Sequence, residues 1–175
     1  MIDQSLTGLI SNGGDIHEQD TAKVYSNVSL SELWIEQIQL IEGIGEDVVR
    51  EQEFLQWAEV ITFIYPIWWT GMPAIMKGYI DRVFSYGFAY KYVNGVQMGM
   101  LKGKKAIILN TQGKSHAEYA SNGMDQALRL TSDKGIFEYC GLDVMYHLFF
   151  ESVPQSDEDT RKVWLRQIAD MASKA

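Results

Sequence analysis

Residues 59–83, "EVITFIYPIWWTGMPAIMKGYIDRV", carry the clearest structural signal in the chain. Residues 59–65 are almost continuously apolar and rich in β-branched side chains, which is typical of a strand buried on both faces. From Pro73 onward, apolar residues recur at helical spacing, and proline suits the first turn of a helix. The stretch therefore predicts one βα unit: a strand, a loop at 66–72 and a helix.

The segments on either side repeat this alternation of strand and helix patterns. Helical patterns fall at 46–58, 123–141 and 156–174, and apolar strand patterns fall at 104–113 and 143–153. The helical pattern at 123–141 predicts either one helix or a helix pair interrupted near Gly135. The last helix has Ser156 or Asp157 as its candidate N-cap.

The first third of the chain has a weaker pattern. Residues 6–14 are the candidate first strand, 21–33 the first helix and 34–42 the second strand. The full order predicts an α/β fold with a doubly wound, parallel, five-stranded sheet in three layers. No linker or repeat divides the chain, so we expect a single domain over residues 1–175.

Composition excludes several classes of function. Hydrophobic residues make up 46% of the 175 residues, which suits a folded domain, and the formal net charge of −8 argues against a nucleic-acid partner. No apolar run reaches membrane-spanning length, and the N-terminus lacks a signal-peptide pattern, so we expect no membrane insertion. A single cysteine, Cys140, fits a cytoplasmic location and a place in the core. We expect no metal, because no Cys or His cluster has ligand spacing.

Three loops follow the clearest strand patterns, at 11–21, 66–72 and 110–119. In a doubly wound fold, ligands bind beyond the carboxyl ends of the strands, where such loops lie. The sequence has neither the glycine-lysine phosphate loop GxxxxGK[ST] nor the dinucleotide pattern GxGxxG. We therefore expect another kind of ligand at this edge of the sheet.

The loop at 66–72 is the most informative. Ile67, Trp68 and Trp69 follow Pro66, and we expect their backbone N–H groups to point out of the end of the strand. A planar heteroaromatic ring such as isoalloxazine could stack there and accept hydrogen bonds. The alternative, that both tryptophans are core or dimer-interface residues, stays open.

The other two loops offer polar groups. Thr111 and Gly113 allow close backbone approach to a ligand, and Tyr119 is a candidate proton donor or hydrogen-bond partner. His116 is a candidate acid or base near neutral pH, although a loop histidine can also be simply solvated. The first loop precedes a helix and suits a phosphate through Thr21, but its acidic residues oppose an anion.

The pattern at 65–90 followed by "LKGKKAIILNTQG" at 101–113 resembles the flavodoxin-like NAD(P)H:quinone oxidoreductase family. The resemblance is dense over 47–120 and poor over 1–33, where the family's His-Pro is missing. It implies a flavin, FMN or FAD, whose ring is held by the loop at 66–70 and whose pyrimidine end is held by the turn at 110–113. The expected cofactor-binding residues are Thr21, Pro66, Ile67, Trp68, Trp69, Thr70, Asn110, Thr111, Gln112 and Gly113.

The resemblance also implies an activity. Tyr119 matches the family's substrate-binding tyrosine, whereas the histidine that accompanies it in the mammalian enzymes falls on Asp125 here. With His116 added from its loop position, Tyr119 and His116 are the candidate catalytic residues. The expected reaction is ping-pong hydride transfer from NAD(P)H through the flavin to a quinone or similar acceptor. Two alternatives stay open: a flavin-binding regulatory or electron-carrier subunit without turnover, and a relative that has lost the cofactor.

The family resemblance further implies a homodimer. The aromatic residues of "FSYGFAYKY" alternate, which would place several of them on one face of an extended segment. An exposed face of this kind marks a contact surface, although a core role is the alternative. The candidate interface residues are Phe84, Tyr86, Phe88, Tyr90 and Tyr92.

Overall fold

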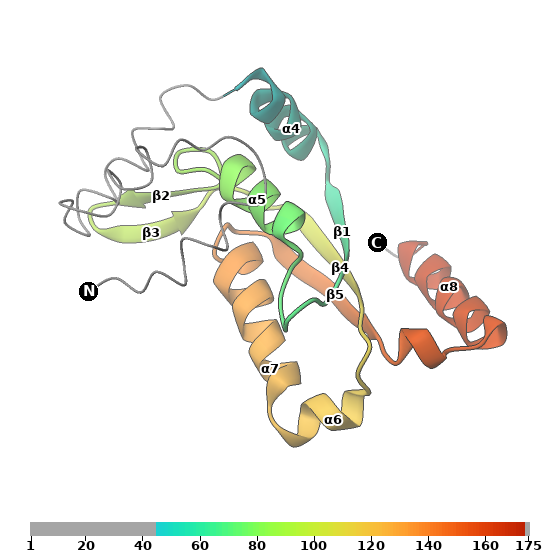
Figure 1. Ribbon diagram of the computed structural model, residues 1–175. Helices are drawn as coiled ribbons and strands as arrows, with labels where there is room; N and C mark the ends of the chain where they lie inside the picture. The colour runs from blue at the N-terminus through green and yellow to red at the C-terminus, as the bar shows by residue number, and fades with distance from the viewer. Residues whose placement is uncertain (1–44, 174–175) are drawn as a thin grey trace, which may run out of the picture. The chain divides into compact units, whose positions relative to one another are not determined.

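The strand expected at 59–65 forms β1, Val60–Pro66, in the computed structural model, which describes residues 45–173 (Figure 1). Two further strands lie beside it in the order β1-β4-β5, with β4 at Lys105–Thr111 and β5 at Asp143–Phe150. Both pairings are parallel, as the alternation of strand and helix patterns predicts. The described residues belong to one compact unit, Ile44–Ala175, and a single domain over 1–175 stays a prediction.

The strand register brings the carboxyl ends together. Pro66 lies opposite Thr111 on β1 and β4, and Thr111 lies opposite Phe150 on β4 and β5. A register shift between Ala106 and Ile107 accommodates one extra residue of β5 near the start of the pairing. The loops that follow β1 and β4 therefore leave the sheet at the same edge.

Helices follow the strands closely. The helical elements are α4 Glu46–Trp57, α5 Ala74–Val83, α6 His116–Ser121, α7 Met124–Arg129, the π-helix η2 Leu130–Glu138, the 3₁₀-helix η3 Val153–Gln155 and α8 Glu158–Ala172. Pro73 immediately precedes α5, and the carboxylate of Asp157 caps α8 by accepting from the Thr160 N–H at 2.8 Å. Of the two candidate caps for α8, the structure therefore selects Asp157.

The core has two parts, one on each face of β4. Ile108 faces the cluster that contains Phe63, Ile80 and Phe137, whereas Leu109 faces the cluster that contains Met171 of α8. Figure 1 accordingly shows α5 and α7 on one side of the strands and α8 on the other. Successive strand residues point to opposite faces, so β4 is buried on both.

The sequence analysis expected the strand at 59–65 to be buried on both faces, and this was wrong for β1. Phe63 and Tyr65 are buried, but the alternate residue Ile64 is 65% exposed. β1 pairs only with β4 among the described residues, and α8 packs against β4 and β5 instead. An apolar run can therefore be a strand buried on one face only.

The five-stranded sheet is confirmed only as far as three parallel strands within residues 45–173. The candidate strands at 6–14 and 34–42, and the helix between them, lie outside the described residues. A second sheet appears instead: β2, Tyr90–Val93, and β3, Val96–Gly99, form an antiparallel hairpin. The sequence analysis did not predict this hairpin, although Asn94-Gly95 is a strong hairpin signal.

The hairpin changes the interpretation of the aromatic segment. The chain turns at Gly87, which has φ 86°, so residues 84–92 do not form one extended strand. Phe84 is buried in the core, whereas Tyr86 and Tyr92 are exposed. The prediction of one extended segment was therefore wrong, although the rings of Tyr86, Tyr90 and Tyr92 still lie close together, with centres 5.9 Å apart in the first pair and 6.5 Å apart in the second.

The helical segment at 123–141 is continuous rather than broken at Gly135. α7 begins after Gly123 and leads directly into η2, whose widened π-turns run from Leu130 to Glu138. Ser132 and Asp133 are buried within η2. π-helical turns are rare and often lie at functional sites, so this segment needs a closer view.

Candidate functional site

The two turns that the sequence selected lie side by side. The Ile67 N–H donates to the Thr111 carbonyl oxygen at 2.8 Å, directly after the Pro66–Thr111 pair of the sheet. The loop after β1 and the loop after β4 therefore form one surface at the carboxyl edge. The prediction that these turns are neighbours is confirmed.

The turn at Trp68–Gly71, which we call the tryptophan turn, has an unusual backbone. Trp68 and Gly71 exchange two N–H···O=C bonds of 3.0 Å, and the residues between them, Trp69 and Thr70, have φ of 49° and 59°. These values are typical of a type I′ turn, which favours glycine and asparagine at both positions. A bulky or β-branched residue in this region is strained, and such strain is concentrated at functional sites.

The tryptophan turn presents groups to solvent in a way that differs in part from the expectation. The sequence analysis expected the N–H groups of Ile67, Trp68 and Trp69 to point outward. Those of Ile67 and Trp68 are instead bonded to the Thr111 and Gly71 carbonyls, so neither is free for a ligand. Within residues 45–173, no acceptor contacts the N–H of Trp69 or Thr70. The Trp69 side chain is 98% exposed. The backbone N–H groups available to a ligand are therefore those of Trp69 and Thr70, further along the loop than expected.

The turn after β4 is more deeply embedded. The buried Asn110 amide donates to the Tyr65 carbonyl at 3.1 Å and so binds the protein itself. Gln112 is buried as well, and its N–H donates to the Phe150 carbonyl at 2.9 Å. Its side-chain oxygen Oε1 has no hydrogen-bond partner among the described residues. Gly113 is exposed, with no atom within 4 Å of the position that a Cβ would take.

His116 and Tyr119 lie on the short helix α6 rather than in a loop. The His116 backbone N–H donates to the Glu151 carboxylate, and its side chain is exposed. Tyr119 is half-buried, three residues further along the same helix. Neither residue lines the cavity described next, and their catalytic roles stay predictions.

A cavity of about 320 Å³ adjoins the tryptophan turn. Ile67, Gly71 and Met72 of the loop line it on one side, and Asn110 and His147 line it from the strands. Leu128, Thr131, Ser132 and Ile136 of α7 and η2 complete the wall, together with Tyr65, Thr70 and Lys77. Its volume falls at the lower end of the range for small-ligand sites.

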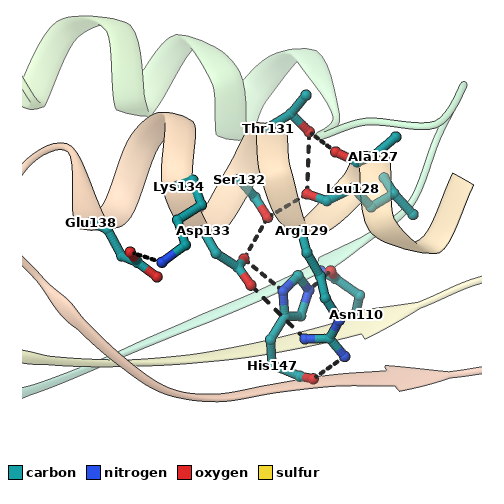
Figure 2. Close-up of polar contacts among 10 residues, drawn as sticks. All are labelled: Asn110, Ala127, Leu128, Arg129, Thr131, Ser132, Asp133, Lys134, Glu138 and His147. Carbon is teal, nitrogen blue, oxygen red and sulfur yellow. Dashed lines mark hydrogen bonds and ion pairs between the residues drawn. The ribbon is translucent and has the colours of Figure 1, made fainter. Parts of the chain in front are cut away.

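The sequence analysis missed the polar chain at one wall of this cavity (Figure 2). His147 Nδ1 lies 2.7 Å from Asp133 Oδ1, and His147 Nε2 lies 2.6 Å from Asn110 Oδ1. The His147 side chain is only 1% exposed. The one available signal was a histidine within the mostly apolar strand "DVMYHLFF". Its partners come from a helix and another strand, so sequence spacing could not reveal them.

Arg129, at the end of α7, contacts two members of this polar chain, His147 and Asp133. Its Nη2 donates to the His147 carbonyl at 3.1 Å, and its Nη1 lies 3.9 Å from Asp133 Oδ2. The guanidinium carbon also lies 4.9 Å from the centre of the Phe149 ring, which stacks on the His147 ring. Burial is the main cause that raises the pKa of the Tyr65 phenol above its ordinary value, and hydrogen bonds with Asn110 and Ser132 oppose the shift. The Tyr65 hydroxyl therefore lies beside the same polar chain.

Other chemistries find no support in the described part of the chain. Burial raises the pKa of the Cys140 thiol to about 11, so this cysteine is a core residue, as expected, rather than a nucleophile. Residues 45–173 contain no cluster of three or more His, Cys, Asp or Glu side chains that could hold a metal ion. Among the same residues, no helix is both long and apolar enough to cross a membrane.

Comparison with known proteins gives a consistent result. Residues 3–172 match the family described as flavodoxin-like fold. The chain is 36% identical over 160 residues to an uncharacterised NAD(P)H oxidoreductase of Haemophilus influenzae, covering 90% of this chain and 78% of that protein. It is 31% identical over 121 residues to NAD(P)H dehydrogenase [quinone] 1 of Rattus norvegicus, covering 67% of this chain but only 44% of that one.

A solved structure extends the comparison to the fold. The NAD(P)H:quinone oxidoreductase from Methanothermobacter marburgensis superposes with a TM-score of 0.66 at 25% identity, covering 87% of this chain and 77% of that one. This chain therefore spans most of two of these relatives and less than half of the rat enzyme.

Proposed function

We propose, from the premise that the chain belongs to the flavodoxin-like family of NAD(P)H:quinone oxidoreductases, that it binds a flavin and reduces a quinone or similar acceptor with NAD(P)H. The relatives described above are oxidoreductases by name, which supports this enzyme class. One observation carries the proposal for this chain: the strained tryptophan turn, with exposed N–H groups, lies against the turn after β4.

The residues of both turns fit a flat ring with polar edges. The N–H groups of Trp69 and Thr70 are donors for ring carbonyl and nitrogen atoms, and the Trp69 indole is free to cover a ring face. Gln112 Oε1 is a buried acceptor without a partner among residues 45–173, which suits a ring N–H. Gly113 leaves open space for close approach. FMN and FAD share this ring, so the fit concerns either cofactor.

A bound flavin supplies the hydride chemistry, and the protein binds and orients the reactants. In this proposal the nicotinamide donor and the acceptor occupy the same slot in turn, which is a ping-pong scheme. Trp68 and Trp69 form a wall of the slot. Tyr119 and His116 on α6 are proposed to bind the acceptor and to stabilise negative charge. Thr21, the predicted phosphate ligand, lies outside the described residues, and the homodimer and the cytoplasmic location stay predictions.

The test is reconstitution followed by turnover. Purified protein is titrated with FMN and FAD separately, following quenching of flavin fluorescence, and is then assayed with NADH and NADPH in the presence of a soluble quinone. We expect saturable binding of one flavin and oxidation of the nicotinamide that depends on the quinone. Binding of neither flavin would rule out the proposed function, including its alternative as a carrier.

The alternative without turnover has one observation in its favour. The net charge of −8 suits docking to a basic protein partner. A carrier subunit would bind flavin but oxidise NAD(P)H only when its partner is present. Steady turnover of the purified protein with free quinone therefore separates the enzyme from the carrier.

A further inference from the structure

The polar chain Asp133–His147–Asn110 joins three elements behind the predicted ring site. Asp133 lies on η2, His147 on β5 and Asn110 near the end of β4, as Figure 2 shows. Asn110 directly precedes Thr111, whose carbonyl accepts the Ile67 N–H of the first turn. Asn110, at the end of this polar chain, is therefore one residue away from the Ile67–Thr111 hydrogen bond that joins the two turns.

The partners of Asn110 fix the orientation of its amide. Its Nδ2 faces the Tyr65 carbonyl oxygen at 3.1 Å, and a carbonyl can only accept. Its Oδ1 must then face His147 Nε2 at 2.6 Å, and an amide oxygen can only accept as well. It follows that His147 Nε2 carries a proton.

The other ring nitrogen is held by Asp133. His147 Nδ1 and Asp133 Oδ1 lie 2.7 Å apart, which is hydrogen-bond distance. Ser132 Oγ lies 2.7 Å from the same Oδ1 and 2.8 Å from the Leu128 carbonyl oxygen, and Arg129 Nη1 lies 3.9 Å from Oδ2. Asp133 therefore fixes the ring from the side opposite Asn110 and keeps Nε2 directed at the Asn110 amide oxygen.

We propose that His147, held by Asp133, is a positioning residue whose Nε2–H fixes the Asn110 side chain and thereby the register of the two turns that bind the ring. The role in ring binding rests on the proposed function, but the assignment of the Nε2 proton does not. η2 takes part because it supplies Asp133, whose Oδ1 lies within hydrogen-bond distance of both Ser132 Oγ and His147 Nδ1.

Substitutions at His147 and Asp133 separate the hydrogen bond to Asn110 from the support of the ring. His147→Gln retains an N–H donor for Asn110 Oδ1, whereas His147→Leu retains none. Asp133→Ala removes the partner of Nδ1 and leaves Nε2 able to donate. Asp159→Ala makes the same chemical change on the exposed surface of α8 and is the control.

The first experiment is nitrogen-15 NMR of the histidine rings in the full, cofactor-free chain, with the His147 signals assigned through His147→Gln. We expect Nε2 of His147 to carry a proton in the wild type and in Asp159→Ala. A wild-type His147 whose Nε2 is unprotonated would overturn the inference, whatever the protein binds.

The second experiment measures flavin affinity in the same set of variants. We expect His147→Leu to weaken binding roughly tenfold, as loss of a buried hydrogen bond would, and His147→Gln to restore most of the loss. We expect Asp133→Ala to weaken binding less than His147→Leu, because the Nε2 donor remains, and Asp159→Ala to leave binding unchanged. Equal affinity in all variants would overturn the positioning role while leaving the proposed function intact. If the wild type binds neither flavin, the proposed function fails and the NMR result alone tests the assignment of the Nε2 proton.

Discussion

Two turns in this protein share a backbone form and differ in their residues. The hairpin turn at Asn94-Gly95 and the tryptophan turn at Trp69-Thr70 both have positive φ at their two central positions, 52° and 77° in the first and 49° and 59° in the second. Asn-Gly is the pair that a type I′ turn favours, whereas Trp-Thr is strongly disfavoured. The hairpin turn has residues that favour its backbone conformation, whereas the tryptophan turn adopts the same positive φ angles with residues that disfavour them. The difference points to a ligand-binding role for the tryptophan turn.

The two turns also differ in how the fold holds them. Gly99, at the end of the hairpin, packs against the backbone of Gly141, and the Leu101 N–H donates to the Cys140 carbonyl at 2.9 Å. Within residues 45–173, the backbone hydrogen bond that ties the tryptophan turn to the sheet lies at its base, between Ile67 and Thr111, and its tip is exposed. The hairpin is thus packed against the rest of the fold, whereas the tryptophan turn is a strained loop that projects from the edge of the sheet.

Gly99→Ala should have the largest effect on stability. A Cβ at this position would lie 2.3 Å from the Gly141 nitrogen and 2.5 Å from the Cys140 carbonyl carbon, both backbone atoms that cannot move aside separately. We expect the free energy of unfolding to fall by about 3 kcal/mol, measured by urea denaturation. Gly78→Ala, where nothing lies within 4 Å, is the control and should stabilise α5 by about 0.5 kcal/mol. An unchanged Gly99→Ala would mean that the hairpin is not anchored as described.

The double variant Trp69→Asn/Thr70→Gly gives the tryptophan turn the residues of the hairpin turn. We expect it to raise the free energy of unfolding by about 2 kcal/mol, because two strained residues are replaced by favoured ones. Flavin affinity should fall at the same time, since the indole is lost. Stabilisation combined with loss of binding would confirm that the strain serves a ligand, whereas a destabilised variant would contradict the comparison.

Trp69→Ala separates the ring from the backbone. The Trp69 side chain is 98% exposed, so we expect the free energy of unfolding to change by less than about 0.5 kcal/mol. Flavin affinity should fall by roughly tenfold, or about 1.4 kcal/mol, through loss of stacking. Trp57→Ala, at an 84% exposed position at the end of α4, should change neither quantity. Equal flavin affinity in wild type and Trp69→Ala would remove the indole from the site.

The smallest expected effect concerns the thiol of Cys140, which lies beneath the hairpin, and this effect depends on pH. Burial raises the pKa of Cys140 from 9.0 to about 11, so the unfolded chain releases this proton first as the pH rises. The contribution of the neutral thiol is complete below pH 9 and is lost as the pH rises toward 11. We expect wild-type stability to fall slightly more steeply than that of Cys140→Ala between these values, in urea titrations at several pH values. Parallel curves would show that the thiol is not buried.

The parts of the fold that the sequence predicted correctly are those with local patterns. The strand at 59–65, the helix after Pro73 and the Asp157 cap all depend on residues that are neighbours in the chain. The hairpin at Asn94-Gly95 has an equally local signal, so it could have been predicted and was missed. The exposed face of β1 could not have been predicted, because it depends on which elements cover the strand rather than on the strand itself.

The candidate site divides in the same way. The sequence selected the turns at 66–72 and 110–113, since parallel strands end at one edge and motifs mark them. It could not show that Asn110 turns inward, or that the free N–H groups belong to Trp69 and Thr70. Both facts depend on φ angles and cross-strand contacts, which residue types constrain only weakly.

The sequence by itself determined the alternation of strands and helices, the family and the two turns, because hydrophobic periodicity and compact motifs are written in consecutive residues. Only the tertiary structure brought Asp133, His147 and Asn110 together, from positions up to 37 residues apart, and gave each nitrogen of the imidazole a hydrogen-bond partner. The physical reason is that a buried polar group is defined by the partners that the fold supplies, and these need not be near it in the chain.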